Sequence, residues 1–214
     1  MTPNLASVKA AEVCNLAPVI PVLVIDDLAT ARPLAEALIA GGLPALEVTL
    51  RTPVALDAIR IMAQVPGGVV GAGTLLTAQD VHDAKEAGAL FGVSPGATDK
   101  LLQACEDQDL PLLPGVATAT EAMALLERGY SVMKFFPAEA AGGAAALKAI
   151  GAPIPQISFC PTGGVTLANA PLYLSLSNTL CVGGSWVAPK ALVNAGDWKE
   201  IEILAREASQ LATS

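Results

Sequence analysis

Short runs of valine, isoleucine and leucine alternate with helical patterns along the chain, and this alternation limits the possible folds most strongly. A strict order of strand then helix favours a parallel sheet, and runs that are apolar on both faces fit strands covered on both sides. Eight such units in 214 residues predict an α/β fold of the closed (β/α)8 type, a TIM barrel, rather than an open doubly wound sheet. The predicted strands span residues 19–25, 45–50, 69–72, 90–93, 112–113, 132–135, 156–159 and 179–182.

The predicted helices follow these strands after short connections. They span residues 29–40, 53–64, 78–87, 99–108, 119–128, 142–149, 167–174 and 198–211. An N-terminal helical segment at about residues 4–16, within residues 1–18, precedes the first strand. Because no linker, charge block or low-complexity tract divides the chain, we expect residues 1–214 to form one barrel domain.

The composition limits the classes of function. Hydrophobic residues make up 53% of the chain, yet no apolar run reaches the about 18 uncharged residues that a membrane-spanning helix needs. The net charge of −8 argues against a nucleic-acid-binding surface, which needs clustered lysine and arginine. The first 16 residues include Lys9 and Glu12 and lack the long apolar run of a signal peptide, so we predict a cytoplasmic protein.

Metal and redox motifs are absent from the sequence. Cys14, Cys105, Cys160 and Cys181 are widely spaced, which predicts buried free thiols in a reducing compartment. The single histidine, His82, lies in a helical pattern and is predicted to be on the surface. One histidine excludes a zinc site built from several, and it excludes a histidine-based triad unless His82 itself is the base. We therefore expect no metal and no cofactor.

Polar residues, glycines and prolines follow seven of the predicted strands, whereas the strand beginnings show nothing comparable. In a (β/α)8 barrel the carboxyl ends of the strands form one rim, and active sites lie on that rim. The seven motifs span residues 47–53, 71–74, 94–96, 114–115, 134–137, 160–164 and 183–186. We therefore expect them to meet at a single site.

Lys134 lies within an apolar strand that ends at Pro137. Alternation along the strand places Val132, Lys134 and Phe136 on one face, so the lysine points where a core residue would. Burial disfavours the charged ammonium, and a neutral amine is a nucleophile toward ketones. The alternative is a structural lysine at the end of a strand, whose ammonium extends to water.

Glu47, Thr49 and Arg51 alternate along the second predicted strand and are expected to share the interior face. An interior carboxylate is costly unless it is paired or hydrogen-bonded, which favours a general acid and base at Glu47 and an anion-binding role for Arg51. The alternative is a structural ion pair between Glu47 and Arg51. Four residues along a strand span about 13 Å, which makes a direct pair difficult.

Glycine pairs follow the seventh and eighth predicted strands, where such barrels often bind phosphate. Glycine lets backbone N–H groups approach an anion, and the hydroxyl groups of Thr162 and Ser185 can add donors. The alternative is that these glycines only terminate strands. The third and fourth strands end in Thr74, which could hydrogen-bond a small carboxylate, and in Pro95, which could form a wall of the site. A lysine, a carboxylate, an arginine and a phosphate site on one rim predict Schiff-base chemistry.

The seven motifs together resemble the class I aldolases that cleave 2-keto-3-deoxy-6-phosphogluconate (KDPG), a family that includes 4-hydroxy-2-oxoglutarate (KHG) aldolases. The resemblance covers about residues 21–189. It implies cleavage of KDPG to pyruvate and glyceraldehyde 3-phosphate in the Entner–Doudoroff pathway, without a metal, by a homotrimer. These motifs do not separate KDPG from its C4 epimer or from KHG.

The resemblance also implies a role for each matching residue. Lys134 corresponds to the Schiff-base lysine and Glu47 to the carboxylate that transfers protons. The implied contacts to the rest of the substrate are Arg51, Thr74, Pro95, Phe136 and Thr162, and the implied phosphate-binding residues are Gly163, Gly164, Gly184 and Ser185.

Other classes of function make different predictions. The histidine count disfavours a metal-dependent aldolase. A phosphate-binding barrel isomerase or epimerase without a covalent intermediate would keep appreciable activity in a Lys134→Arg variant. A phosphosugar-binding protein without activity would explain the glycine pairs but would leave Glu47 and Lys134 as unexplained interior charges.

Overall fold

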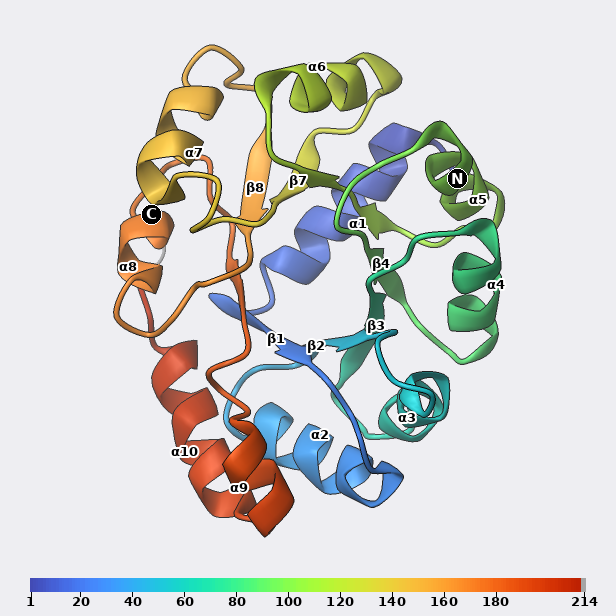
Figure 1. Ribbon diagram of the computed structural model, residues 1–214, viewed down its shortest axis with the longest axis vertical. Coiled ribbons are helices and arrows are strands. Elements are labelled where there is room, and N and C mark those ends of the chain that lie inside the picture. Colours follow the sequence, from blue (N-terminus) through green and yellow to red (C-terminus); the bar gives the residue numbers. More distant parts are fainter. Residues whose placement is uncertain (213–214) are drawn as a thin grey trace.

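Parallel strands occupy the centre of the computed structural model, which describes residues 1–212, and helices surround them (Figure 1). The last two residues of the predicted 1–214 domain lie outside the described residues. The strands are β1 (Val19–Leu23), β2 (Ala45–Thr49), β3 (Val69–Gly73), β4 (Phe91–Val93), β5 (Leu112–Leu113), β6 (Gly115–Val116), β7 (Val132–Phe135), β8 (Ser158–Pro161) and β9 (Val182–Gly184).

The helices cover the outer face of the strands. They are α1 (Pro3–Cys14), the short 3-10 helix η1 (Leu28–Thr30), α2 (Ala31–Ala40), α3 (Ala55–Met62), α4 (Ala78–Glu86), α5 (Asp99–Asp107), α6 (Ala119–Arg128), α7 (Gly143–Gly151), α8 (Ala170–Leu174), α9 (Lys190–Ala195) and α10 (Trp198–Ser209). No helix within residues 1–212 has both the length and the apolar character needed to cross a membrane.

The strands pair in parallel and form a curled sheet. One part has the order β5-β4-β3-β2-β1-β9 and the other has the order β6-β7-β8. Only Pro114 separates β5 from β6, and its carbonyl accepts a 2.8 Å hydrogen bond from the N–H group of Lys134. Isolated parallel bridges pair Phe159 with Thr179 and Thr162 with Gly183, which connects β8 to the segment of β9.

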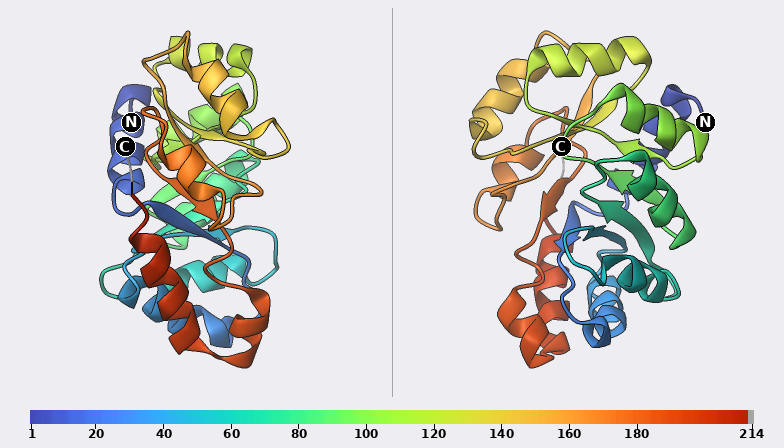
Figure 2. Two further views of the ribbon diagram at one scale, coloured as in Figure 1. Left: turned by 90° about the vertical axis from the view of Figure 1, so that its left-hand side faces the viewer. Right: turned by 45° about the vertical axis from the view of Figure 1, so that its right-hand side comes forward.

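Helix α1 lies across the amino ends of the strands. The Ser7 hydroxyl accepts a 2.9 Å hydrogen bond from the N–H group of Ser131, which directly precedes β7. Ala10 and Cys14 of α1 belong to an interior core cluster that also contains Cys160 and residues of β1, β2, β4, β5 and β7. The left view of Figure 2 shows α1 at the end of the molecule where β1 begins. The opposite, carboxyl ends of the strands are therefore the end left for a site.

Local capping explains where several helices begin. Thr77 and Thr118 each form a capping box with an acidic residue three positions later, Asp80 and Glu121 respectively. These side chains satisfy backbone N–H groups that have no partner inside the helix. Hydrogen bonds from the N–H groups of Ala117 and Thr118 lower the pKa of Glu121.

The predicted alternation of strands and helices is confirmed, with corrections at four places. The fifth strand continues after Pro114 as β6, because proline removes only one backbone donor. The eighth strand is Val182–Gly184 rather than 179–182, since the glycines pair with Ile20 and Pro21 of β1 instead of ending the strand. The predicted helix 167–174 begins only at Ala170, and the short helix α9 was not predicted.

The predictions for cysteine and histidine are confirmed. All four cysteines are buried free thiols. His82 is exposed on α4, as its position in a polar helical pattern indicates.

Candidate functional site

Lys134 and Glu47 form a buried pair inside the curled sheet. The Lys134 Nζ atom lies 3.3 Å from Glu47 Oε1, although the two residues are 87 positions apart in the chain. The two side chains are 5% and 4% exposed respectively. The alternation along β2 and β7 therefore predicted correctly that both point inward, and it is the curvature of the sheet that brings them together.

Glycines on the neighbouring strands allow close packing around the pair. A Cβ atom at Gly73 of β3 would lie 2.3 Å from Glu47 Oε1. On the other side, Gly115 of β6 pairs directly with Lys134 of β7. A Cβ atom at Gly115 would lie 2.3 Å from the carbonyl carbon of Pro95, so any side chain there would also push against the loop after β4.

Two effects act in opposite directions on the pKa of Glu47. Burial raises the pKa of the Glu47 carboxyl, and the charge of Lys134 acts in the opposite direction with a smaller effect. The Lys134 ammonium position also lies 5.1 Å from the centre of the Phe136 ring, within range of a cation–π contact. A buried carboxyl that holds a proton more readily than usual suits repeated proton transfer near neutral pH.

Arg51 and Thr74 form a second contact at the same end of the sheet. Arg51 Nε donates a 3.1 Å hydrogen bond to Thr74 Oγ1. Thr74 has φ 63°, a left-handed conformation that is rare for residues other than glycine and that is typical of functional sites. The predicted alternation does not extend to Arg51, because β2 ends at Thr49 and the Arg51 N–H group turns back to the Thr49 carbonyl. Arg51 is therefore exposed and lies beyond the end of the strand that contains Glu47.

The glycine pair after β8 presents free backbone donors. Gly163 and Gly164 have φ values of 101° and 79°, which favour glycine. Within residues 1–212 neither N–H group donates a hydrogen bond to protein, although both carbonyls accept one. Consecutive N–H groups in such conformations form a concave surface that binds anions. Gly163 and Gly164 therefore form a concave backbone surface of the kind that binds anions, the anion cradle.

Thr162 connects this cradle to the second glycine pair. The bridge between Thr162 and Gly183 places β8 and β9 side by side, and a Cβ atom at Gly183 would lie 2.3 Å from Thr162 Oγ1. Gly184 is similarly confined, since a Cβ atom there would overlap the Trp186 ring. The exposed Ser185 follows directly.

The structure thus arranges the predicted residues in three groups. Lys134, Glu47 and Phe136 are in direct contact, Arg51 contacts Thr74, and Thr162 lies beside the glycine pairs. Pro95 follows β4 and its carbonyl faces Gly115 of β6. Glu47 and Lys134 lie within β2 and β7, whereas Arg51, Thr74, Pro95, Phe136 and Thr162 follow the carboxyl ends of their strands.

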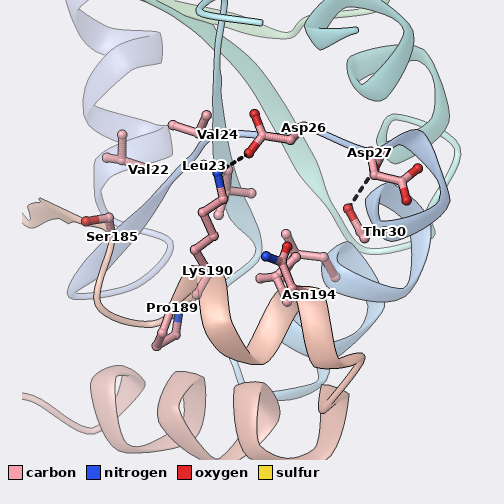
Figure 3. Close-up of a pocket in the computed structure, with 13 residues that line it drawn as sticks. Val22, Leu23, Val24, Asp26, Asp27, Thr30, Ser185, Pro189, Lys190 and Asn194 are labelled. Atoms are coloured by element: carbon pink, nitrogen blue, oxygen red, sulfur yellow. Dashed lines mark hydrogen bonds and ion pairs between the residues drawn. The ribbon is translucent and has the colours of Figure 1, made fainter.

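A cavity of about 400 Å³ lies beside this rim, between the end of β1 and α9 (Figure 3). Of the predicted site residues it contains only Ser185. Lys190 Nζ forms a 2.6 Å ion pair with Asp26 at this cavity. Both side chains are largely exposed, so the pair contributes little to stability.

Three features of the site were missed by the sequence reasoning. No individual role was predicted for Gly73, whereas the structure shows that Glu47 fills the volume beside it. A glycine one strand away from an inward carboxylate is the signal that would have indicated this. The contact of Glu139 with Tyr173 was also missed, because no local pattern relates residues 34 positions apart. The contact of Asn169 with the carbonyl of Gly164, five positions away, was missed as well.

Comparisons with known proteins agree on one family. A family model described as KDPG and KHG aldolase matches residues 10–204. The 2-dehydro-3-deoxy-phosphogluconate aldolase of Zymomonas mobilis is 55% identical over 197 residues, which are 92% of this chain and 93% of that protein.

Two solved structures extend the likeness to the fold. The Zymomonas mobilis 2-keto-3-deoxy-6-phosphogluconate aldolase with 3-phosphoglycerate superposes with a TM-score of 0.92 at 52% identity, covering 97% of this chain and 98% of that one. The Legionella pneumophila KDPG aldolase, with pyruvate captured as a covalent carbinolamine intermediate, has a TM-score of 0.91 at 48% identity, with coverages of 94% and 98%.

Proposed function

The chain belongs to the KDPG and KHG aldolase family, and from this premise we propose that it is a class I aldolase that cleaves KDPG to pyruvate and glyceraldehyde 3-phosphate. The observation that carries the proposal is the buried pair of Lys134 and Glu47, with 3.3 Å between Nζ and Oε1. The capture of pyruvate as a carbinolamine in the Legionella pneumophila relative supports covalent chemistry of this kind.

The first half of the proposed reaction forms the Schiff base. Because burial raises the pKa of Glu47, the carboxyl can hold the proton while Lys134 is a free amine. The amine attacks the C2 carbonyl carbon of the substrate, the carboxyl proton of Glu47 passes to the carbonyl oxygen, and the nitrogen returns one proton to Glu47 to give a neutral carbinolamine. Loss of that oxygen as water, with a further proton supplied through Glu47, leaves a protonated imine on Lys134.

The second half breaks the carbon–carbon bond. The Glu47 carboxylate, directly or through a water molecule, removes the proton of the C4 hydroxyl group. The C3–C4 bond breaks, its electron pair moves into the imine to form an enamine, and glyceraldehyde 3-phosphate leaves. Glu47 then returns a proton to C3, and hydrolysis of the imine releases pyruvate and restores the amine of Lys134.

The remaining predicted residues are proposed to bind the two ends of the substrate. Arg51 and Thr74, already in contact, suit the substrate carboxylate and a hydroxyl group, since arginine binds carboxylates with two parallel donors. The substrate-binding wall is proposed to consist of Pro95, Phe136 and Thr162. The free N–H groups of Gly163 and Gly164, with Gly184 and Ser185, are proposed to bind the phosphate.

Four further properties follow as proposals from the same premise. We infer that the curled sheet closes as a (β/α)8 barrel, which the two bridges between β8 and β9 and the pairing of β9 with β1 support. We infer a single domain, a cytoplasmic location and a homotrimer. The homotrimer is what the family resemblance implies, and sedimentation velocity tests it.

Cleavage of KHG to pyruvate and glyoxylate is a second proposed activity. The chemistry at C2 to C4 is the same, and the description of the matching family names both substrates. We expect lower catalytic efficiency on KHG than on KDPG, because the smaller product leaves the anion cradle unused.

Reductive trapping tests the proposed function. Incubation with pyruvate and borohydride, followed by peptide mass mapping, should add the reduced pyruvyl group to Lys134 alone. The Lys134→Arg variant should show neither the adduct nor measurable KDPG cleavage, whereas Lys148→Arg, on α7, should behave as the unmodified protein. An unmodified Lys134 in active protein would refute the mechanism.

A further inference from the structure

The Gly163–Gly164 cradle is held from outside by residues that the proposed reaction does not use. Glu139, in the loop between β7 and α7, donates its backbone N–H group to the carbonyl of Gly163 over 3.0 Å. Its side chain lies against Gly164, where an added Cβ atom would meet Glu139 Cβ at 2.7 Å. The position of Glu139 thus determines where both glycines lie.

Tyr173 of α8 fixes Glu139 in turn. The Tyr173 hydroxyl donates a short hydrogen bond to Glu139 Oε1 across 34 positions of the chain. Tyr173 is completely buried, whereas Glu139 lies at the surface. A hydrogen bond between a buried tyrosine and a carboxylate is of the strong, charge-assisted kind. It holds the carboxylate against α8.

Helix α8 also contacts the cradle directly. Asn169, four positions before Tyr173, donates from Nδ2 to the carbonyl of Gly164 over 3.1 Å. Asn169 directly precedes α8, so the start of this helix contacts Gly164, while Tyr173 within the helix reaches Gly163 only through Glu139. Figure 1 shows α7 and α8 next to each other beside β8, which is consistent with this arrangement.

We propose that Tyr173 and Glu139 are positioning residues that keep the N–H groups of the Gly163–Gly164 cradle directed at the substrate phosphate, and so set the preference for phosphorylated substrates. The inference rests on the proposed function, in which this cradle binds phosphate. The Tyr173 hydroxyl has a second effect, because it keeps the negative carboxylate of Glu139 engaged rather than free to repel the phosphate.

The test compares two substrates that differ only in the phosphate, KDPG and unphosphorylated 2-keto-3-deoxygluconate. Tyr173→Phe should raise KM for KDPG roughly tenfold, the effect of losing one hydrogen bond to a charged group. Its kcat on KDPG and its kcat/KM on the unphosphorylated substrate should stay within twofold of the unmodified protein. Inorganic phosphate should likewise inhibit the variant more weakly.

Variants of Glu139 provide a test that does not depend on the buried tyrosine. Glu139→Gln keeps an oxygen that accepts the Tyr173 hydrogen bond, and it should retain most of the preference for KDPG. Glu139→Ala removes the acceptor and should reproduce the effect of Tyr173→Phe. Because Glu139 is at the surface, both variants should fold.

Tyr130→Phe is the matched control, because Tyr130 is also completely buried and donates its hydroxyl to a glutamate, Glu106, over 3.2 Å far from the cradle. It should leave the ratio of the two substrates unchanged. Equal losses on both substrates, or an unchanged ratio in Tyr173→Phe and Glu139→Ala, would overturn the inference. Absence of KDPG cleavage and of the pyruvate adduct in the unmodified protein would instead refute the proposed function.

Discussion

Replacing Gly73 with alanine should disable proton transfer while leaving Lys134 in place. The added Cβ atom would lie 2.3 Å from Glu47 Oε1, 2.7 Å from Cγ and 2.9 Å from Cδ, whereas ordinary contacts of this kind begin at 3.4 Å. The carboxylate must therefore move by about 1 Å, since an interior at close-packed density has no spare volume to absorb the methyl group. None of the nearest atoms belongs to Lys134.

The size of the effect follows from this displacement. Misplacing a reacting group by about 1 Å can cost about 100-fold in rate, which corresponds to about 2.7 kcal/mol in the activation barrier. The methyl group should also cost about 1–3 kcal/mol of stability through overpacking. We therefore expect kcat for KDPG cleavage to fall about 100-fold, while trapping of pyruvate on Lys134 still reaches completion at long incubation.

Coupling pyruvate release to lactate dehydrogenase measures kcat, and urea unfolding measures the stability. Gly92→Ala is the matched control, because its Cβ atom would lie 2.5 Å from Leu75 Cδ1, in the outer core away from Glu47. It should lose comparable stability and keep its kcat. A folded Gly73→Ala variant with kcat within threefold of the unmodified protein would show that the Glu47 carboxylate is not needed at its present position.

Two further predictions concern stability. Burial raises the pKa of Glu47 above its ordinary value of 4.5, so the native state binds more protons than the unfolded chain just above that pH, and stability is lost as pH rises through the folded pKa. The test uses a Lys134→Met background, which removes the opposing charge; there the urea midpoint should fall as pH rises from 4.5. Adding Glu47→Gln to this background should remove the fall. Parallel pH profiles of the two variants would contradict the assignment to Glu47. Thr118→Ala should cost about 1 kcal/mol of unfolding free energy through loss of the α6 cap, whereas exposed Thr120→Ala should cost much less; similar losses would count against the cap.

The order of strands and helices could be predicted because it depends on short-range patterns. Residue composition and periodicity predicted the bounds of most strands and helices to within a few residues. Helix α6 was predicted at its observed bounds, Ala119–Arg128. The errors lie where tertiary contacts override local signals. Gly183 and Gly184 continue a strand because Thr162 and Trp186 occupy the space that side chains would fill, and a sequence shows only that glycine often ends strands.

The direction of individual side chains was equally predictable within a strand, but not beyond its end. Alternation correctly predicted that Glu47 and Lys134 point inward, because they lie within β2 and β7 respectively. Arg51 follows a turn, where the period of two no longer applies, and its contact with Thr74 depends on the left-handed backbone of that residue. Such a conformation is not encoded in the residue type, since threonine rarely adopts it.

The location of the proposed site can be argued from the volume inside the sheet. Apolar branched side chains normally fill such an interior, and two long polar side chains can replace them only where the adjacent strands contribute little volume. Gly73 stands beside Glu47, and a side chain at that position would occupy the volume that the carboxylate fills. An inward charged residue with glycine on the next strand is therefore a stronger indication of a catalytic interior than either residue alone. Because Gly73 leaves the volume that Glu47 occupies and burial raises the pKa of that carboxyl, the glycine contributes to the properties of the proposed proton-transferring group.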